Sequence, residues 1–246
     1  MAGRRPLNRD EERRLLRVVR TLEPRTRALI TAQWMTGFRI SEILRWTVGT
    51  VQRNGQLVSK IGLPPRQMKG GYGQTRWVPM LPELQRALRS YLGWLQRRIV
   101  LTPTLPLFLS RETDGEGNAR ALSPDMARHI IKAVFARAGI EDDGRLGSHT
   151  LRKTWARSLY ESSGRDILIV SAGLNHSSVA VTQAYLQPEE DDLMAAMQAC
   201  DFTRGPRLKS LPPQVPFVPA ATSAVAGHGA TTGEIVTADA NNVRVA

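Results

Sequence analysis

The sequence predicts a mainly α-helical domain that carries one small three-stranded antiparallel β-sheet. Three observations indicate this fold class. Most of the chain up to residue 200 repeats apolar residues at the three- and four-residue spacing of amphipathic helices. Between residues 47 and 80 the period changes to alternation, and Asn54-Gly55 predicts a hairpin turn there. Prolines, glycines and capping residues divide the remaining stretches into separate helices.

The N-terminal part of the chain predicts two helices and a short helical turn. Asn8 followed by Glu11 is a capping-box pattern that starts the first helix. Pro24 suits the first turn of the second helix, and Gly37 ends it. A glycine permits a tight corner, so we expect Arg39 to project from the junction that follows.

The predicted strands cover residues 48–53, 56–61 and 75–80, and a glycine-rich loop that contains Lys69 joins the last two. A long amphipathic helix then begins at Pro82 and runs to about residue 98, with leucines along one face.

The second half of the chain predicts further helices joined by short loops. They cover residues 123–139, 148–164, 166–172, 178–186 and 188–199. A short apolar piece at 107–109 and a polar loop at 113–119 precede them. Beyond residue 202 the composition changes to Pro, Gly, Ala, Thr and Val without a helical pattern. This change predicts one folded domain over 1–202 and a disordered tail over 203–246.

The charge of the chain predicts a polyanionic partner. The formal net charge is +12, and since the tail contributes only +2, residues 1–202 keep +10. Nucleic acid is the usual partner of such a basic domain, whereas a smaller excess would indicate only a solvated surface. Cys200 is the only cysteine, which excludes an intrachain disulfide and a cysteine-based zinc cluster. No apolar run approaches the roughly 18 residues of a membrane span, so we expect a cytoplasmic protein without membrane contact.

Polar side chains that could act in catalysis gather in the stretch from residue 148 to residue 186. His149 and Arg152 are spaced i, i+3 and share one face of the predicted helix. His176 follows in a turn, and Tyr185 lies near the end of the next helix. Two imidazoles, a guanidinium and a phenol in this arrangement suggest chemistry on a phosphate.

Each of these residues, taken alone, also has a purely structural interpretation. A lone histidine or buried tyrosine is more often a satisfied core residue than a catalyst, and Lys69 alone would be an ordinary loop lysine. Arg39 differs, because a charge beside a glycine corner and an apolar turn needs a partner, and Glu42 lies one helical turn later. Their joint occurrence in a consistent order is what favours a functional site.

The order of these residues resembles the catalytic domain of the tyrosine recombinases, the phage integrase family. Residues 36–42, Thr-Gly-Phe-Arg-Ile-Ser-Glu, are similar to the family's first arginine box. Residues 149–152, His-Thr-Leu-Arg, resemble its H-x-x-R box. Residues 174–178, Leu-Asn-His-Ser-Ser, continued to Tyr185, resemble the box of the last histidine and the nucleophile. Lys69 matches the catalytic lysine more loosely.

The resemblance covers about residues 8–200 and implies the DNA breaking-rejoining fold of this family. It further implies that Tyr185 attacks a DNA phosphodiester and forms a covalent 3′-phosphotyrosyl link. Arg39 and Arg152 would stabilise the negative charge of the transition state. His176 would donate a further hydrogen bond.

The remaining roles follow from the same resemblance. His149 would donate to the phosphate or accept the tyrosine proton, Lys69 would protonate the departing 5′ oxygen, and Glu42 would orient the arginines. No metal or other cofactor is implied, because the arginines take the place of a cation, and no ATP, because bond energy is conserved.

The implied partner is double-stranded DNA, on which a homotetramer would exchange strands, with a monomer or weak dimer in its absence. An accessory DNA-bending protein is a further partner of such enzymes, and the active protein would associate with the bacterial nucleoid. Integration, excision, inversion and resolution share this chemistry, and the sequence does not separate them.

The sequence departs from the family pattern in three places. Asn175 stands where glycine is commoner, and Lys153 follows Arg152 where histidine or arginine is frequent. The resemblance begins close to the N-terminus, without an obvious N-terminal core-binding domain. A short form like the fimbrial inversion recombinases, a fragment, or a protein that grips DNA with a partner's help all fit this layout.

Alternative functions remain open at the level of the sequence. The main rival is a non-catalytic DNA-binding relative that regulates recombination or transcription. A topoisomerase of the same chemistry is a weaker alternative. A metal-dependent nuclease is disfavoured, because Asp142 and Asp143 are adjacent carboxylates in a loop and such pairs are usually solvated.

Overall fold

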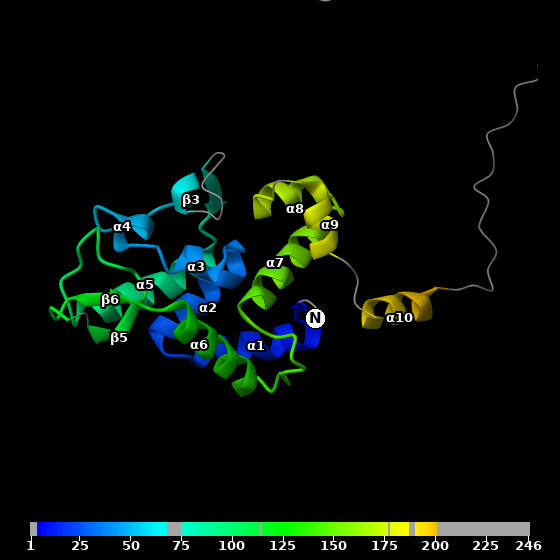
Figure 1. Cartoon of the computed structure of the whole chain (residues 1–246), viewed down its shortest axis with the longest axis horizontal. Helices are drawn as coiled ribbons and strands as arrows, with labels where there is room; N and C mark the ends of the chain where they lie inside the picture. Colours follow the sequence, from blue (N-terminus) through cyan, green and yellow to red (C-terminus); the bar gives the residue numbers. More distant parts are fainter. Residues whose placement is uncertain (1–3, 68–74, 114, 177, 187–189, 201–246) are drawn as a thin grey trace, which may run out of the picture. The chain divides into compact units, whose positions relative to one another are not determined.

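The structure is a computed structural model (Figure 1) that describes residues 4–67, 75–113, 115–176, 178–186 and 190–200. The helices are α1 (Arg9–Thr21), α2 (Pro24–Thr36), α3 (Ile40–Ile43), α4 (Val48–Val51), α5 (Pro82–Gln96), α6 (Pro124–Arg137), α7 (Ser148–Ser162), α8 (Ile167–Leu174), α9 (Val179–Tyr185) and α10 (Glu190–Ala199). The strands are β1 (Gln52–Arg53), β2 (Gln56–Leu57), β3 (Lys60–Leu63), β4 (Arg76–Pro79), β5 (Leu109–Thr113) and β6 (Ala119–Ala121). The mainly helical fold class with small antiparallel sheets is confirmed.

Several parts of the sequence-based prediction fall on residues that the structure does not describe, including the loop with Lys69. The tail over 203–246 lies outside the described residues, as does the predicted start of the last helix at Pro188. Among the described helices, none combines the length and the apolar content that crossing a bilayer requires.

The helix boundaries follow the capping residues that the sequence contains. Asn8 caps α1 in a capping box, since its side chain accepts from the backbone N–H of Glu11 while the Glu11 carboxylate accepts from the Asn8 N–H. Pro24 occupies the first turn of α2 as predicted. Ser123 caps α6, and Asp166 caps α8. The capping residues in the sequence therefore predict where most of these helices begin.

The predicted three-stranded sheet is wrong in its pairing, because the described strands form separate two-stranded antiparallel sheets. The hairpin at Asn54-Gly55 is confirmed, with positive φ at both residues. Residues 48–51 form α4 instead of a strand, because Val48 and Val51, three residues apart, are its two buried side chains.

Strands β3 and β4 form a second hairpin, and strands β5 and β6 form a third. The β3–β4 hairpin frames the connection that contains Lys69, which itself lies outside the described residues. The β5–β6 hairpin occupies the place where the sequence predicts a polar loop. Its residues are mostly exposed, so no alternation of buried apolar residues marks it as a sheet.

Buried apolar residues form two clusters, and helix α7 contributes to both. The larger cluster includes Phe38, Trp46 and Tyr91, and Leu151 of α7 belongs to it. The smaller cluster lies around Ala156 of α7 and the buried residues of α8. Figure 1 shows α7 running between the α8–α9 pair and the helices α2 and α6. Helix α7 contacts α2, α6 and α8.

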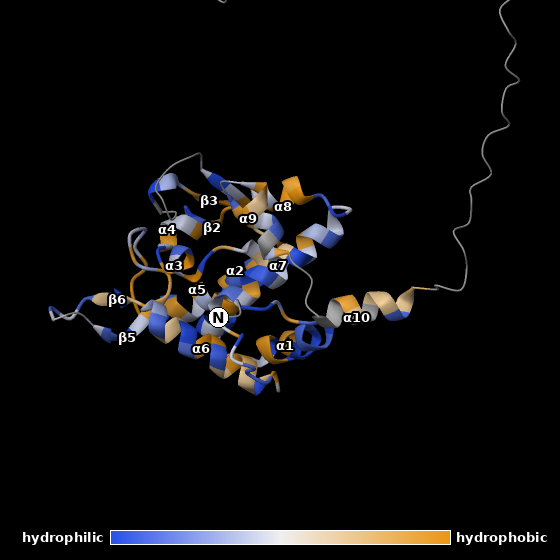
Figure 2. Ribbon diagram, turned by 45° about the vertical axis from the view of Figure 1, so that its right-hand side comes forward, coloured by the Kyte–Doolittle hydropathy of each residue, from blue (hydrophilic) through white to orange (hydrophobic). Residues whose placement is uncertain are grey.

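Helix α8 is apolar over most of its length, as its orange colour in Figure 2 shows. One side of it is buried in the smaller cluster through Val170 and Leu174. Leu168 and Ile169 are exposed on the other side, at 63% and 47% of their surface.

Gly37, at the end of α2, joins the two clusters by close packing against an aromatic ring. Its φ of +61° is left-handed, and a Cβ there would overlap the Trp155 side chain of α7. Gly173 of α8 packs against the same ring, since its Cβ would lie 2.9 Å from Trp155 Cη2. Trp155 thus packs against two glycines that leave room for it.

We expect Gly37→Ala to lower the free energy of unfolding by about 2–4 kcal/mol, since left-handed strain of about 1 kcal/mol adds to overpacking of about 1–3 kcal/mol. The matched control is Gly55→Ala. Gly55 has a φ of +75° but no atom within 4 Å of the added Cβ, so only the strain remains. Urea unfolding of both variants measures the difference, and equal losses would contradict the role of the Trp155 contact.

Candidate active site

The corner after Gly37 presents Arg39 together with its predicted partner. The Arg39 backbone N–H donates to Glu42 Oε2 at 2.7 Å, and Arg39 Nη1 donates to Glu42 Oε1 at 2.9 Å. Glu42 is buried, whereas the Arg39 side chain keeps 27% of its surface exposed. The carboxylate therefore fixes the guanidinium at the corner while part of it still faces solvent.

Arg152 lies almost fully buried on α7 and links three parts of the chain. Its Nη1 donates to the carbonyl oxygen of Gly37 at 2.5 Å, and its Nη2 donates to that of Leu174 at 2.9 Å. The same Nη2 lies 3.5 Å from Nε2 of His176. One guanidinium thus holds together the glycine corner, the end of α8 and the histidine that follows it.

The turn that carries His176 depends on a left-handed residue. Asn175 ends α8 with φ 52° and ψ 51°, a conformation that glycine and asparagine tolerate better than other residues. Asparagine at this position, where the family more often has glycine, therefore keeps the same turn. His176 then lies edge-on to the Tyr185 ring, with 5.3 Å between the ring centroids.

Tyr185 ends α9 inside the same cluster of cations. Its hydroxyl is buried and has no hydrogen bond of standard geometry among the described residues. Burial raises the pKa of Tyr185, while the charge of Arg152, a hydrogen-bond interaction with its guanidinium outside standard geometry, and then the charge of Arg39 act to lower it. The Lys153 ammonium lies over the ring, 5.5 Å from its centroid. The phenol and both guanidinium groups therefore meet within a single chain.

Both histidines are neutral near pH 7. Burial, followed by the charges of Arg152, Arg39 and Arg76, lowers the pKa of His176 to about 4. Partial burial, then the charges of Arg152 and Arg39, lowers the pKa of His149 as well, while the side chain stays in contact with solvent. A neutral imidazole offers one N–H donor and one acceptor nitrogen, so each ring is able to bind a phosphate oxygen or take up a proton.

Arg76, at the start of β4, is a member of this cluster that the sequence analysis misses. Its side chain is buried, stacks over Phe38 with 4.2 Å from Cζ to the ring centroid, and donates from Nη2 to the carbonyl oxygen of Thr36 at 2.7 Å. Burial lowers its pKa to about 9, which leaves it charged at neutral pH. Alternation along β4 was the available signal, because Arg76 shares the buried face with Val78.

Lys69, by contrast, cannot be placed, because it lies outside the described residues. The β3–β4 hairpin on either side of Lys69 is described. Arg76 of β4 links this hairpin to the residues before Arg39 through its hydrogen bond to the Thr36 carbonyl oxygen. The role of Lys69 remains a prediction.

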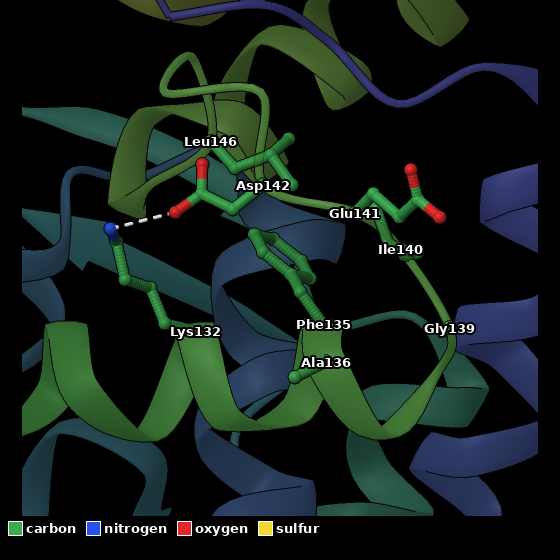
Figure 3. Close-up of a pocket in the computed structure, with 8 residues that line it drawn as sticks. All are labelled: Lys132, Phe135, Ala136, Gly139, Ile140, Glu141, Asp142 and Leu146. Atoms are coloured by element: carbon green, nitrogen blue, oxygen red, sulfur yellow. Dashed lines mark hydrogen bonds and ion pairs between the residues drawn. The ribbon is translucent and has the colours of Figure 1, made fainter.

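The adjacent carboxylates considered for a metal site are both engaged by cations. Asp142 Oδ2 accepts from Lys132 Nζ at 2.8 Å beside a cavity of about 340 Å³ (Figure 3), and Asp143 pairs with Arg5 at 2.7 Å. Within the described residues, no group of three or more His, Cys, Asp or Glu is arranged to hold a metal ion. These carboxylates anchor the loop in front of α7.

Comparison with known proteins gives one family match and several related recombinases. The sequence model described as "Phage integrase family" matches residues 5–191. The tyrosine recombinase XerD of Corynebacterium glutamicum is 31% identical over 169 residues, which cover 69% of this chain and 50% of XerD. The chain spans about half the length of curated relatives such as this XerD and the tyrosine recombinase XerC of Rhodospirillum centenum.

Solved structures share the fold of this chain. The crystal structure of XerA recombinase aligns with a TM-score of 0.61 and 24% identity over 82% of this chain and 68% of the XerA chain. XerH site-specific recombinase bound to a palindromic difH substrate aligns with a TM-score of 0.60 and 22% identity over 79% of this chain and 52% of XerH. At these identities the likeness concerns the fold alone.

Proposed function

The chain belongs to the phage integrase family, and from this we propose that it is the catalytic part of a site-specific tyrosine recombinase that cuts and rejoins double-stranded DNA. The observation that carries the proposal is the meeting of Tyr185 with the guanidinium groups of Arg39 and Arg152 and with His176 in one chain. A protein that only bound DNA would have no use for a buried phenol beside the Arg152 guanidinium in this place.

The first requirement of such an enzyme is a cationic site for the phosphate. A phosphodiester repels nucleophiles, and its transition state carries still more negative charge, so donors fixed in advance lower the barrier most. Arg152 is held by two carbonyl oxygens and Arg39 by Glu42, so neither needs to be ordered when the phosphate arrives.

The second requirement is a nucleophile that can lose its proton. In the proposed step the Tyr185 oxygen attacks phosphorus, its proton passes to His149 or solvent, and the bond from phosphorus to the 5′ oxygen breaks. Lys69 protonates the leaving 5′ oxygen, and His176 donates to a phosphate oxygen. The product is a 3′-phosphotyrosyl link and a free 5′ hydroxyl, which reverses the step on the same or another strand. The step uses neither ATP nor a metal ion.

Strand exchange between two duplexes needs four such sites, so the proposal includes a homotetramer assembled on DNA, with an accessory DNA-bending protein at sites that must be bent. XerH has been solved with its difH substrate, which supports DNA as the partner by analogy. A protein with this task would work in the cytoplasm at the nucleoid.

The test is a covalent trap on DNA. We expect the protein, mixed with nicked duplexes drawn from the DNA that flanks its gene, to form an adduct that survives detergent, because the nick releases the 5′ strand and blocks religation. The adduct should form equally in EDTA. Gel mobility and sequencing of the attached strand identify the site. Binding without any adduct on a duplex that the protein recognises would favour the rival, a non-catalytic DNA-binding relative.

A further inference from the structure

Thr182, one turn before Tyr185 on α9, contacts the ring nitrogen of His176 that faces away from Arg152. Resting on the proposed function, we propose that Thr182 is a positioning residue whose hydroxyl lets the neutral His176 ring change tautomer, so that Nε2 carries the proton when a phosphate binds.

The geometry gives each ring nitrogen of His176 one partner. Nδ1 lies 3.0 Å from Thr182 Oγ1, and Nε2 lies 3.5 Å from Arg152 Nη2. Thr182 is fully buried. Two other buried threonines, Thr36 and Thr154, donate to the carbonyl oxygen four residues earlier in their own helices. In the described part of the chain, the hydrogen-bond contact found for the Thr182 hydroxyl is instead the imidazole.

In the free protein, Arg152 sets the tautomer. A guanidinium only donates, so its contact with Nε2 requires a lone pair on that nitrogen. His176 is neutral at pH 7, because its pKa is lowered to about 4, and it therefore carries a single proton. That proton lies on Nδ1, where it is donated to the Thr182 oxygen.

A bound phosphate reverses this arrangement. The non-bridging oxygens of a DNA phosphodiester carry no hydrogen and only accept, so a bond to His176 requires the proton on Nε2. The ring then gains a proton at Nε2 from solvent and loses the Nδ1 proton to solvent, and its charge is unchanged. Nδ1 becomes an acceptor, which the Thr182 hydroxyl satisfies by turning its own hydrogen toward the ring. A carboxylate or carbonyl at this place would hold the proton on Nδ1 and prevent the change.

The direct test is nitrogen NMR of the full chain labelled with ¹⁵N-histidine, with His176→Asn to identify the signal. We expect the free protein to carry the proton on Nδ1. Dimethyl phosphate, a phosphodiester without a P–OH group and the probe for the DNA phosphate, should move it to Nε2. Thr182→Ser, which keeps the hydroxyl, should behave like the native chain. Thr182→Val has nearly the same shape but leaves Nδ1 without a donor once Nε2 is protonated, so dimethyl phosphate should move its proton to Nε2 only in part. Thr31→Val removes a buried helical threonine elsewhere and should change nothing.

Adduct formation in the covalent trap gives the second measurement. We expect Thr182→Val to slow it about tenfold or more, in line with a lost hydrogen bond at a partly buried site, and Thr182→Ser to stay within about threefold. A native His176 signal that does not respond to dimethyl phosphate, or a Thr182→Val signal that responds as fully as the native one, overturns the inference. Native-like cleavage by Thr182→Val does so too, while the proposed function stands. If the native chain forms no adduct, the proposed function is wrong. The NMR measurement then tests the role of Thr182 independently.

Discussion

Tyr185→Phe is expected to abolish covalent adduct formation, with a rate loss of at least about 10⁴-fold, while DNA affinity changes by less than about threefold. The substitution removes only the attacking oxygen, and no other group in the site replaces a nucleophile. The phosphate contacts of the arginines remain, so binding should persist. The trap on a nicked duplex measures the first quantity, and fluorescence anisotropy at fixed salt measures the second.

The same variant also has an expected effect on folding. The Tyr185 hydroxyl is buried, and its interaction with Arg152 falls outside standard hydrogen-bond geometry, so it carries part of the roughly 1–3 kcal/mol of folding free energy that an unsatisfied buried polar group costs. Tyr185→Phe should therefore be at least as stable as the native chain in urea unfolding. A stable variant without cleavage is the pattern of a residue retained for chemistry.

Tyr160→Phe is the matched control for Tyr185. Tyr160 packs against the same small cluster of α7 and α8, so the substitution makes the same chemical change nearby. It should cleave at the native rate. An adduct formed by Tyr185→Phe but lost in Tyr160→Phe would show that the nucleophile is assigned to the wrong tyrosine.

Arg152→Ala is expected to lose cleavage by at least about 10³-fold and to lower the free energy of unfolding by about 3 kcal/mol. The rate falls because the site loses a fixed donor to the developing charge. Stability falls because the buried carbonyl oxygens of Gly37 and Leu174 lose their donor and a cavity is left. Single-turnover cleavage and urea unfolding measure the two effects.

Arg39→Ala separates these two effects. The Arg39 side chain is partly exposed and its described side-chain contact is Glu42, so its loss should slow cleavage to a similar degree yet cost only about 1 kcal/mol of stability. If both variants lose equal stability, or if Arg152→Ala cleaves at the native rate, the double role given to Arg152 is wrong.

How much of the site the sequence predicts depends on how local each contact is. The pairing of Arg39 with Glu42 lies within one helical turn, and the structure confirms it. The bond from Arg152 to Gly37 joins residues 115 positions apart, so spacing alone does not reveal it. The contact of His176 with Thr182 depends on the left-handed turn at Asn175, which a list of motifs does not convey.

The fold shows the same division. Helices with caps and an apolar stripe, such as α1 and α6, were predictable because each carries its own signal. Helix α4 was mistaken for a strand, because four residues contain too little pattern to separate a turn of helix from alternation. The β5–β6 hairpin has mostly exposed side chains, so the hydropathy of the sequence does not alternate there and does not indicate strands.

The cations around the glycine corner are not balanced. Among the described residues whose charges meet there, Arg39, Arg76 and Arg152 stand against the single carboxylate of Glu42. Folding without an anion therefore carries a standing electrostatic cost, borne by the rest of the packed interior. If the proposed function holds, a DNA phosphate bound beside these arginines relieves that cost, and by thermodynamic linkage part of the affinity for DNA then comes from repulsion that is already present in the folded chain.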